Sequence, residues 1–448
     1  MTTPGDYLSQ LNSSIIRLGL GPVRKLLASL HNPQNRYASV LIGGTNGKGS
    51  IAATTAAIMQ AAGYRVGLYT SPHLIDIRER IRVNGDMIAV NELYGLIDEV
   101  RGQVGEEITY FEFLTAVAFL YFYRRQVEVA ILEVGLGGRL DATNVVIPIL
   151  SVISNISQEH DDYLGKGLAN IAREKGGIIP VGGVCVTAAR QQPVREILAG
   201  ICLDRQAQLY QLGRDISVRR HQDGSPRSGR DPDRGPKGQA FSYRGIKKNY
   251  PRLACSLRGR HQVENTALAL AAIELLADRG GLPVSDAAVY RGMQNTRWEG
   301  RLEVLQSDPQ IIVDGGHNPA GIAVLGRALQ EDFSYRRLIL IFGVLRDKNF
   351  QLMLKKIAPL ADMVIITRPD TARAVPPGEL TAAARLYCDH VEIVADTRQA
   401  LCMAMAVAAR EDLICVAGSL YLVGEIKQAY TAMTRSELPM SALPTQTD

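Results

Sequence analysis

Residues 43–50 read GGTNGKGS, between a β-branched run at residues 38–42 and an Ala- and Thr-rich run that extends to about residue 62. The pattern predicts a strand, a glycine-rich loop and a helix, in that order. Such a loop directs backbone N–H groups at phosphate oxygens, and the helix N-terminus adds partial positive charge. We therefore expect a nucleotide to bind through Thr45, Asn46, Gly47, Lys48, Gly49 and Ser50.

Within this loop, Lys48 can reach the terminal phosphates and the Ser50 hydroxyl can meet Mg²⁺. The general phosphate-loop pattern has a Gly four residues before the Gly-Lys pair, and Ser or Thr directly after the lysine. Here Ile42 occupies the first of these positions and Gly49 the second. A glycine turn without a ligand is the alternative, and the lysine between suitable flanking elements argues against it. The departure from the general pattern narrows the choice of family.

Short β-branched runs alternate with helical patterns along the chain, which predicts an α/β fold with parallel sheets flanked by helices. The N-terminal runs are residues 38–42, 66–70, 127–134, 150–156 and 184–187. The C-terminal runs are residues 311–313, 338–342, 363–367, 391–394 and 413–417. We predict a P-loop NTPase-like N-terminal domain with a central, mostly parallel sheet at residues 1–296. A smaller Rossmann-like α/β domain is predicted at residues 297–448.

The composition restricts the partners and the compartment of the chain. Lys and Arg total 50 against 45 Asp and Glu, with no concentrated basic stripe, so a nucleic-acid partner is not expected. No uncharged run is long and apolar enough to span a bilayer, and residues 1–10 lack the pattern of a signal peptide. The six cysteines form no C-x-x-C pair, which is typical of free thiols in a reducing compartment. We expect a cytoplasmic monomer.

Residues 219–238 contain no Val, Ile, Leu, Phe or Met and are rich in Gly, Pro, Asp and Arg. Such a stretch cannot bury enough apolar surface to offset the conformational entropy that ordering would cost. We predict a mobile surface insertion between two strands. A polyanion-binding arm is the less favoured reading.

Two further polar residues stand at the ends of predicted strands. Glu133 lies at the end of the run at residues 127–134, and Ser71 follows the run at residues 66–70. Parallel α/β sheets bind ligands at the carboxyl ends of their strands, and Mg²⁺ prefers hard oxygen ligands. We therefore expect Glu133, Ser71 and Ser50 to hold Mg²⁺. A helix-capping or solvated role is the alternative for Glu133.

Ten ordered blocks together resemble the folylpolyglutamate synthase and dihydrofolate synthase branch of the Mur ligase superfamily, over nearly the whole chain. Three substitutions depart from the family pattern: Gly176 and Gly316 where alanine is usual, and Glu159 where aspartate is usual. The blocks are GTNGKGS (44–50), TSPHL (70–74), ERI (79–81), TYFE (109–112), EVGLGGRLDATN (133–144), IAREK (171–175), GRHQVEN (259–265), WEGR (298–301), DGGHN (314–318) and GSLY (418–421).

The resemblance implies an ATP-dependent ligase that converts a carboxylate into an acyl phosphate and joins it to the amine of L-glutamate. The implied acceptors are dihydropteroate and the γ-carboxylate of (tetrahydro)folate, so a bifunctional enzyme is expected and a monofunctional folylpolyglutamate synthase is the alternative. His160 joins the implied Mg²⁺ ligands, with two Mg²⁺ sites expected. Lys175 is implied to be carbamylated by CO₂, which would give Mg²⁺ carbamate oxygens in place of an ammonium. An exposed helical lysine is the alternative.

The resemblance also assigns the remaining site residues. Asn265, Arg301 and Asp314 would complete the ATP site, although Arg301 could instead form an ion pair with Glu299 or Glu303. The implied catalytic residues are Lys48, Lys175 and His317, and Ser419 would bind glutamate. The pterin end would be bound by Leu18, Gly19, Leu20, Gly21, Thr109, Tyr110, Phe111, Glu112, Leu140, Asp141 and Ala142; a core role is the alternative for Tyr110 and Phe111.

Two rival functions remain to be weighed. A Mur enzyme that extends a nucleotide-sugar peptide usually has an additional N-terminal domain, whereas only 37 residues precede the first predicted strand here. A P-loop switch or binding protein would hydrolyse or hold nucleotide without joining two substrates. Nucleotide turnover that depends on both an acceptor and glutamate separates a ligase from a switch.

Overall fold

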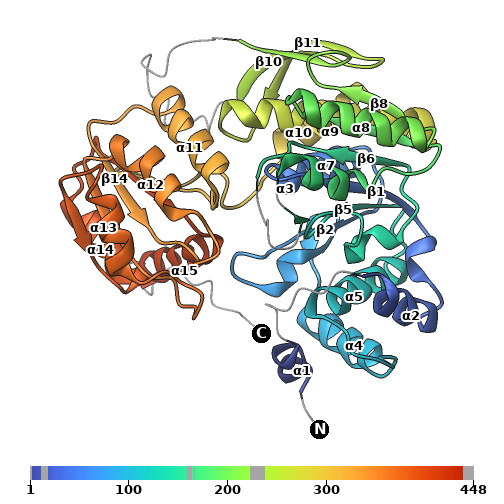
Figure 1. The fold of residues 1–448 in the computed structure, drawn as a ribbon, viewed down its shortest axis with the longest axis horizontal. Coiled ribbons are helices and arrows are strands. Elements are labelled where there is room, and N and C mark those ends of the chain that lie inside the picture. Colours follow the sequence, from blue (N-terminus) through green and yellow to red (C-terminus); the bar gives the residue numbers. More distant parts are fainter. Residues whose placement is uncertain (1–2, 12–18, 159–163, 166, 222–237, 437–448) are drawn as a thin grey trace, which may run out of the picture. The chain divides into compact units, whose positions relative to one another are not determined.

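The computed structural model describes residues 3–11, 19–158, 164–165, 167–221 and 238–436 (Figure 1). The described residues through Trp298 form one compact unit, and those from Glu299 onward form a second. Each unit contains a mostly parallel sheet packed against helices, which confirms the predicted α/β class. The boundary predicted after residue 296 lies two residues before this division.

The first unit is organised around an eight-stranded sheet with the order β4-β3-β2-β5-β1-β6-β7-β8. Strand β3 pairs antiparallel with both β2 and β4, and the other neighbouring strands pair in parallel. The central strands are buried on both faces, which explains their continuous apolar sequences. The strands are β1 (Ala38–Gly43), β2 (Val66–Tyr69), β3 (Ile81–Val83), β4 (Asp86–Met87), β5 (Val129–Glu133), β6 (Leu150–Ile153), β7 (Val184–Thr187) and β8 (Gln208–Gln211).

Helices cover both faces of this sheet (Figure 1). Leu41 of β1 joins a core with α2, α4, α5, α7 and α8, whereas Val40 and Ile42 pack on the other face with α3, α9 and α10. This alternation follows from the two-residue period of a strand. The helices are α1 (Pro4–Gln10), α2 (Gly21–Ser29), α3 (Lys48–Ala61), α4 (Val90–Arg101), α5 (Tyr110–Arg124), α7 (Leu168–Gly176), α8 (Gln192–Asp204), α9 (Arg260–Arg279) and α10 (Asp286–Asn295), with 3₁₀ turns η1 (Pro33–Asn35), η2 (Ile77–Arg80) and η3 (Ala142–Val145).

A small antiparallel sheet in the first unit contains β9 (Ser217–Arg220), β10 (Gln239–Arg244) and β11 (Asn249–Cys255). Arg219 and Arg220 pair with Ser242 and Phe241 of β10, so the insertion predicted from residue 219 begins too early. Strand pairing uses backbone groups, so two arginines can extend a strand without burying apolar side chains. Residues 222–237 of the predicted insertion lie outside the described residues.

The second unit has a six-stranded sheet with the order β12-β13-β17-β14-β15-β16, in which β12 alone is antiparallel. The five strands predicted here are present, each within one residue of its predicted ends. The elements are β12 (Glu303–Ser307), β13 (Gln310–Val313), α11 (Pro319–Asp332), β14 (Leu338–Phe342), α12 (Phe350–Ile357), η4 (Ala358–Leu360), β15 (Met363–Ile366), α13 (Pro377–Ala384), β16 (Val391–Ile393), α14 (Thr397–Val407), β17 (Leu413–Ala417) and α15 (Leu420–Ser436).

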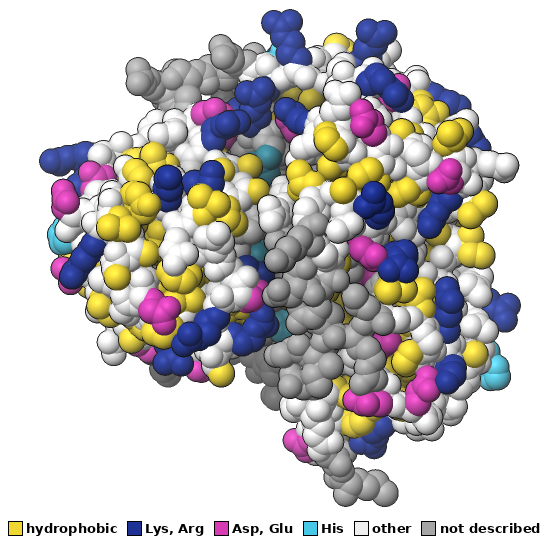
Figure 2. All heavy atoms as spheres, in the orientation of Figure 1, with side chains coloured by type: hydrophobic (Ala, Val, Ile, Leu, Met, Phe, Trp, Pro, Cys, Tyr) yellow, Lys and Arg dark blue, Asp and Glu magenta, His cyan; other side chains and the backbone are white. Residues whose placement is uncertain are grey.

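The surface drawn in Figure 2 carries Lys and Arg side chains interspersed with Asp and Glu. This mixture of signs agrees with the small formal net charge of +5. None of the helices in the described ranges is long and apolar enough to cross a membrane.

Candidate active site

The predicted phosphate-loop and metal residues follow neighbouring parallel strands of the first unit. In the sheet order, β2, β5, β1 and β6 are adjacent, and they lead respectively to Ser71, Glu133, the loop at residues 43–50 and residues 154–158. Ile42 of β1 pairs with Glu133 on one side and with Val152 on the other. The carboxyl edge of the sheet therefore brings these segments together, where α/β proteins bind ligands.

The phosphate loop has a backbone conformation that requires glycine. Gly44 has φ +124° and Gly47 has φ +91°, both in the region that side chains disfavour. A Cβ atom on Gly44 would lie 2.0 Å from Ser154 Oγ and 2.8 Å from the Ser154 backbone nitrogen. A Cβ atom on Gly47 would lie 2.4 Å from Asn265 Oδ1, so the predicted ATP residue Asn265 lies beside the loop.

Gly49, which replaces the usual Ser or Thr after the loop lysine, lies against the indole of Trp298. A Cβ atom at Gly49 would lie 2.8 Å from Trp298 Nε1 and 2.9 Å from Cζ2. The indole ring is rigid, so it could not move aside as the end of a flexible side chain could. The close approach of Trp298 therefore accounts for the glycine that departs from the general phosphate-loop pattern.

Two lysines donate to the same carbonyl oxygen of the phosphate loop. Lys48 Nζ lies 3.1 Å from Gly44 O and 3.0 Å from Thr45 O. Lys175 Nζ, from α7, lies 2.8 Å from Gly44 O, and the Lys175 residue is 2% exposed. The reading of Lys175 as an exposed helical lysine is therefore wrong. The Lys48 ammonium beside this loop suits the negative charge of phosphates.

Asn155, which the sequence did not single out, fastens the phosphate loop to the segment that follows β6. Its Oδ1 accepts the Asn46 backbone N–H at 3.1 Å, and its Nδ2 donates to Asn46 O at 3.1 Å. The backbone N–H of Thr45 also donates to Asn155 O at 2.8 Å. These bonds occupy the amides of Thr45 and Asn46. The first four N–H groups of α3, from Gly47 to Ser50, precede its first intrahelical bond and are the amides available to a phosphate.

The predicted Mg²⁺ ligands of the first unit are partly assembled. Glu133 Oε2 accepts the Ser71 backbone N–H at 3.1 Å, so the ends of β2 and β5 are joined. Ser50 Oγ is buried and has no hydrogen-bond partner within the described ranges. A buried hydroxyl without a partner, at the start of the helix that follows the phosphate loop, fits a ligand of a hard cation. His160 lies outside the described residues.

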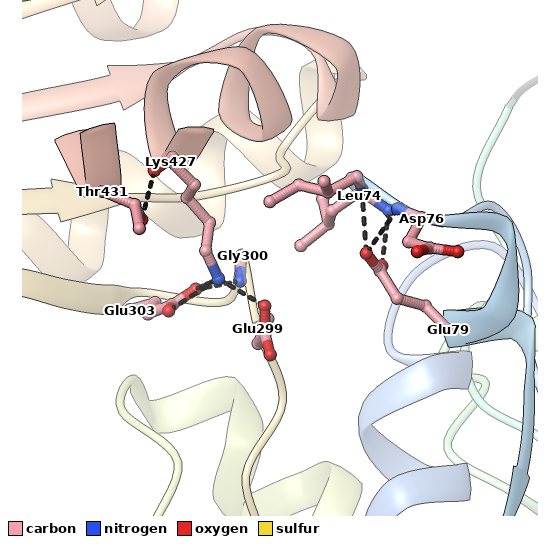
Figure 3. Close-up of polar contacts among 9 residues, drawn as sticks. Leu74, Asp76, Glu79, Glu299, Gly300, Glu303, Lys427 and Thr431 are labelled. Atoms are coloured by element: carbon pink, nitrogen blue, oxygen red, sulfur yellow. Dashed lines mark hydrogen bonds and ion pairs between the residues drawn. The ribbon is translucent and has the colours of Figure 1, made fainter. Parts of the chain in front are cut away.

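The segment after Ser71 is held by a carboxylate. Glu79 accepts the backbone N–H groups of Leu74, Ile75 and Asp76 at 2.8 to 2.9 Å (Figure 3). Arg80 Nε donates to His73 Nδ1 at 2.9 Å. Burial, followed by the charge of Arg80, lowers the pKa of His73 to about 4, so this imidazole is neutral at pH 7 and can accept from the guanidinium.

The predicted pterin residues at the start of α5 have structural partners. Thr109 and Glu112 form a capping box: Glu112 Oε2 accepts the Thr109 N–H at 2.9 Å, and Thr109 Oγ1 accepts the Glu112 N–H at 3.3 Å. Glu112 Oε1 is buried without a hydrogen-bond partner in the described part of the chain. The Arg80 guanidinium lies 5.6 Å from the centre of the Tyr110 ring.

Phe111 and Asp141 meet at the Gly-rich loop after β5. The Phe111 ring lies against Gly135, where a Cβ atom would come within 2.6 Å of it, and is 6.0 Å from the Tyr69 ring. Asp141 accepts the Leu136 N–H at 2.8 Å and the Thr143 hydroxyl at 2.6 Å. Burial raises the pKa of Asp141, and these donors oppose the rise.

The other predicted pterin residues differ in their burial and packing. Leu140 is partly exposed beside Asp141, and Ala142 is buried at the start of η3. Leu20 precedes α2 and packs against the same apolar core as Phe111, with Gly19 and Gly21 on either side. Leu18 lies outside the described residues.

The second unit gathers its predicted residues after β13 and β17. Asp314 is buried and accepts the N–H groups of Leu302 at 3.0 Å and Gly316 at 2.8 Å. Burial raises the pKa of Asp314, and the charge of Arg301 opposes this. Arg301 Nη1 lies 2.8 Å from the position of a Cβ atom on Gly315, so the guanidinium runs alongside the backbone of residues 314–316.

His317 and Ser419 follow adjacent parallel strands of this sheet. His317 Nδ1 is 2.8 Å from Gly315 O, and Ser419 Oγ accepts the Tyr421 N–H at 3.2 Å. The Gly418 N–H donates to Gly316 O at 3.1 Å, which ties the two loops together. The predicted glutamate-side residues are thus neighbours at the carboxyl edge of the second sheet.

The alternative partners of Arg301 are engaged elsewhere. Lys427, which the sequence did not single out, lies 2.5 Å from Glu299 and 2.8 Å from Glu303 (Figure 3). Both carboxylates that could have bound Arg301 are therefore paired with another cation. No local pattern marks Lys427, since more than 100 residues separate it from either partner.

Two known domain families match this chain, one in each unit. The model of the Mur ligase middle domain matches residues 42–273, and the model of the Mur ligase, glutamate ligase domain, matches residues 300–420. A dihydrofolate synthase/folylpolyglutamate synthase of Bacillus subtilis is 33% identical over 421 residues, which cover 92% of this chain and 95% of that protein.

Solved structures with similar folds contain nucleotides. Escherichia coli FolC in complex with DHPP and ADP is 29% identical with a TM-score of 0.86, over 96% of this chain and 97% of that chain. A bifunctional folylpolyglutamate synthase/dihydrofolate synthase of Yersinia pestis, complexed with AMPPNP and a Mn ion, is 29% identical with a TM-score of 0.81, over 95% of this chain and 96% of that chain. With the phosphate loop and the two matched domains, these similarities show that the chain belongs to the Mur ligase family, in its dihydrofolate synthase/folylpolyglutamate synthase branch.

Proposed function

We propose that this chain is an ATP-dependent ligase that joins L-glutamate to dihydropteroate and to the γ-carboxylate of reduced folates. The observation that carries the proposal is the phosphate loop, where Lys48 and Lys175 both donate to Gly44 O at 3.1 and 2.8 Å. It occurs in a chain whose Bacillus subtilis relative is named for both activities and is matched over 95% of its length. A monofunctional folylpolyglutamate synthase is the second candidate, favoured by the name of the Thermotoga maritima structure.

The reaction requires that a carboxylate oxygen attack the γ-phosphorus of ATP, so that ADP leaves and an acyl phosphate forms. The amine of glutamate then attacks the acyl carbon, and inorganic phosphate leaves with the original carboxylate oxygen. Phosphoryl transfer depends mainly on positioning and on neutralising charge. Lys48 and the amides at the start of α3 supply these functions in the first unit, and Arg301 supplies a further cation.

Mg²⁺ would be held by Ser50, Ser71 and Glu133, with His160 as a further ligand, and two such sites are proposed. The orphaned Ser50 hydroxyl and the contact between Ser71 and Glu133 support this assignment. When bound, a divalent cation would neutralise the developing charge on the phosphates. Asn265 and Asp314 are proposed to complete the ATP site. Asn265 lies beside Gly47 of the phosphate loop in the first unit, and Asp314 interacts with the charge of Arg301 in the second unit.

The acceptor would lie against Phe111 and Asp141, whose loop adjoins the end of β5. An aromatic face and a buried acceptor group suit a flat, hydrogen-bonding heterocycle. The remaining pterin residues are proposed as the wall of the same site. Glutamate would be bound by His317 and Ser419, since Gly418 and Gly316 link their loops.

Carbamylation of Lys175 is part of the proposal. Carbamylation requires the neutral amine, and burial favours the neutral form. The carbamate nitrogen keeps one N–H, so Lys175 Nζ can still donate to Gly44 O after the modification. The modified side chain would then present oxygens to a cation.

The compartment and assembly follow from the same proposal. We propose a cytoplasmic monomer, because all six cysteines are free thiols and five of them are buried, as expected in a reducing compartment. Small-molecule substrates alone are proposed as partners.

The experiment that tests the proposal supplies purified protein with ATP, Mg²⁺ and labelled glutamate, and with dihydropteroate or reduced folates in parallel. Label should enter both products, and ADP should form only when both an acceptor and glutamate are present. Incorporation with folates alone would support the monofunctional candidate. ADP formation without either substrate would favour a nucleotide switch over a ligase.

A further inference from the structure

Lys427 of α15 forms a buried charge cluster with the two glutamates that flank Arg301. Its Nζ lies 2.5 Å from Glu299 Oε2 and 2.8 and 2.9 Å from the two oxygens of Glu303 (Figure 3). The Lys427 side chain is 11% exposed, against 25% for Glu303 and 53% for Glu299. A cation this buried is stable only when it is paired, and here two carboxylates pair with it.

The cluster is joined to the backbone that carries Arg301. Glu303 Oε2 accepts the Gly300 N–H at 2.6 Å, and Gly300 O accepts the Gly315 N–H at 2.7 Å. One residue beyond Arg301, the Leu302 N–H donates to Asp314 at 3.0 Å. The backbone on both sides of Arg301 is therefore fixed, on one side through Glu303 and on the other through Asp314.

Lys427 competes with Arg301 for the carboxylates of Glu299 and Glu303. Glu299 and Glu303 stand two residues before and two residues after Arg301, so both are within reach of its guanidinium along the chain. Without Lys427 the two carboxylates would lose the cation that pairs with them in the described part of the chain. Arg301 could then pair with them, and an arginine held by carboxylates is less available to a phosphate.

We propose that Lys427 is a positioning residue that pairs with both Glu299 and Glu303 and so leaves Arg301 available to the phosphates of ATP. This inference rests on the role given to Arg301 under the proposed function. Lys427 itself acts through Arg301 and touches no substrate in this account. Removal of its charge should therefore harm the steps that depend on Arg301 and spare the binding of glutamate.

The test compares Lys427→Met with a triple variant that also carries Glu299→Gln and Glu303→Gln. Lys427→Met should lower kcat/KM for ATP by about 100-fold, as expected when a charged group is misplaced, with KM for glutamate unchanged. In the triple variant, kcat/KM for ATP should recover to within about 10-fold of wild type, because the two glutamines carry no charge that competes for Arg301. The amide oxygen introduced by Glu303→Gln can still accept the Gly300 N–H, so the backbone contact is kept. Lys427→Arg should retain most activity.

Arg337→Met is the matched control. Arg337 forms an ion pair of 2.6 Å with Asp412 in the same unit, and the two residues directly precede the parallel strands β14 and β17. We expect both Arg337→Met and Lys427→Met to lower the unfolding temperature. Arg337→Met should leave kcat/KM for ATP unchanged.

Two outcomes would overturn the inference. Wild-type kinetics in Lys427→Met, or a triple variant as inactive as Lys427→Met, would show that the charge cluster does not protect Arg301. Arg301→Met separates this failure from failure of the proposed function. If Arg301→Met is inactive while Lys427→Met is normal, the inference about Lys427 fails alone; if Arg301→Met is fully active, the role proposed for Arg301 fails with it.

Discussion

The phosphate loop of the first unit and the Arg301 segment of the second each present a cation, and they are built in different ways. The phosphate loop depends on backbone shape: Gly44 and Gly47 have positive φ, and Asn155 fixes the main chain of Asn46. The Arg301 segment depends on side-chain charges contributed by Lys427, 124 residues or more away from its partners in sequence. The first kind of site leaves a local sequence pattern, whereas the second does not.

The same difference predicts how each site tolerates substitution. A backbone-built loop has no room for an added atom, so a single methyl group should disable it. A charge-built segment should tolerate isosteric changes that keep the charges balanced. The Lys427 variants test the charge-built segment, and four further experiments test the phosphate loop.

The largest effect is expected for Lys48→Ala, because Lys48 contributes charge at the phosphates and little packing. ADP formation in the complete ligase reaction should fall by about 1,000-fold, a loss typical of a cation lost from a phosphoryl-transfer site. The unfolding temperature should stay near that of wild type. The exposed Lys25→Ala is the control, with unchanged kinetics. A loss of stability as severe as the loss of activity would contradict this assignment.

Gly44→Ala should reduce ATP turnover by about 100-fold through misplacement of the loop. The added Cβ would meet the Ser154 backbone nitrogen at 2.8 Å, and this backbone atom cannot rotate away. Gly63→Ala is the matched control, because Gly63 also has positive φ (+97°) but no atom within 4 Å of the added Cβ. It should cost about 1 kcal/mol of stability with no kinetic change. Equal kinetics in both variants would show that crowding of the loop is unimportant.

Removal of CO₂ and bicarbonate should lower activity by roughly 10-fold if the Lys175 carbamate supplies oxygen ligands to Mg²⁺. Lys175→Ala should be partly restored by a short added carboxylic acid, and Lys48→Ala should not. The measurement is ligase activity in degassed buffer before and after bicarbonate is returned. Full activity without CO₂, together with an unmodified Lys175 in a high-resolution map of active protein, would refute carbamylation.

The smallest effect is expected for Asn155→Ala, which removes two hydrogen bonds from the Asn46 backbone. Because the Thr45 N–H still donates to the backbone carbonyl of residue 155, the loop should loosen without collapsing. KM for ATP should rise by about 10-fold, equivalent to about 1.4 kcal/mol. Asn84→Ala removes a side-chain bond to the Val66 N–H and should affect stability alone. An unchanged KM in Asn155→Ala would show that other contacts fix the loop.

The sequence predicted the regular parts of the fold and those site residues that stand in local patterns. The strands from residue 338 to 342 and from 413 to 417 were predicted with their observed ends, because buried parallel strands are continuous apolar runs. The last two residues of strand β9, Arg219 and Arg220, fall in the predicted insertion because they bury little apolar surface. Asn155 and Lys427 were missed because an amide in a loop and a helical lysine acquire their partners only through tertiary contact.

The transfer of an oxygen atom tests the central claim most directly. If ATP activates the acceptor as an acyl phosphate, a folate whose γ-carboxylate carries ¹⁸O at both oxygens should pass one labelled oxygen to each inorganic phosphate formed. Mass spectrometry of the phosphate, in the presence of glutamate, ATP and Mg²⁺, gives the result. One ¹⁸O in every phosphate is the predicted outcome. Unlabelled phosphate would mean that water attacks ATP, and the chain would then be a nucleotide hydrolase and not a ligase.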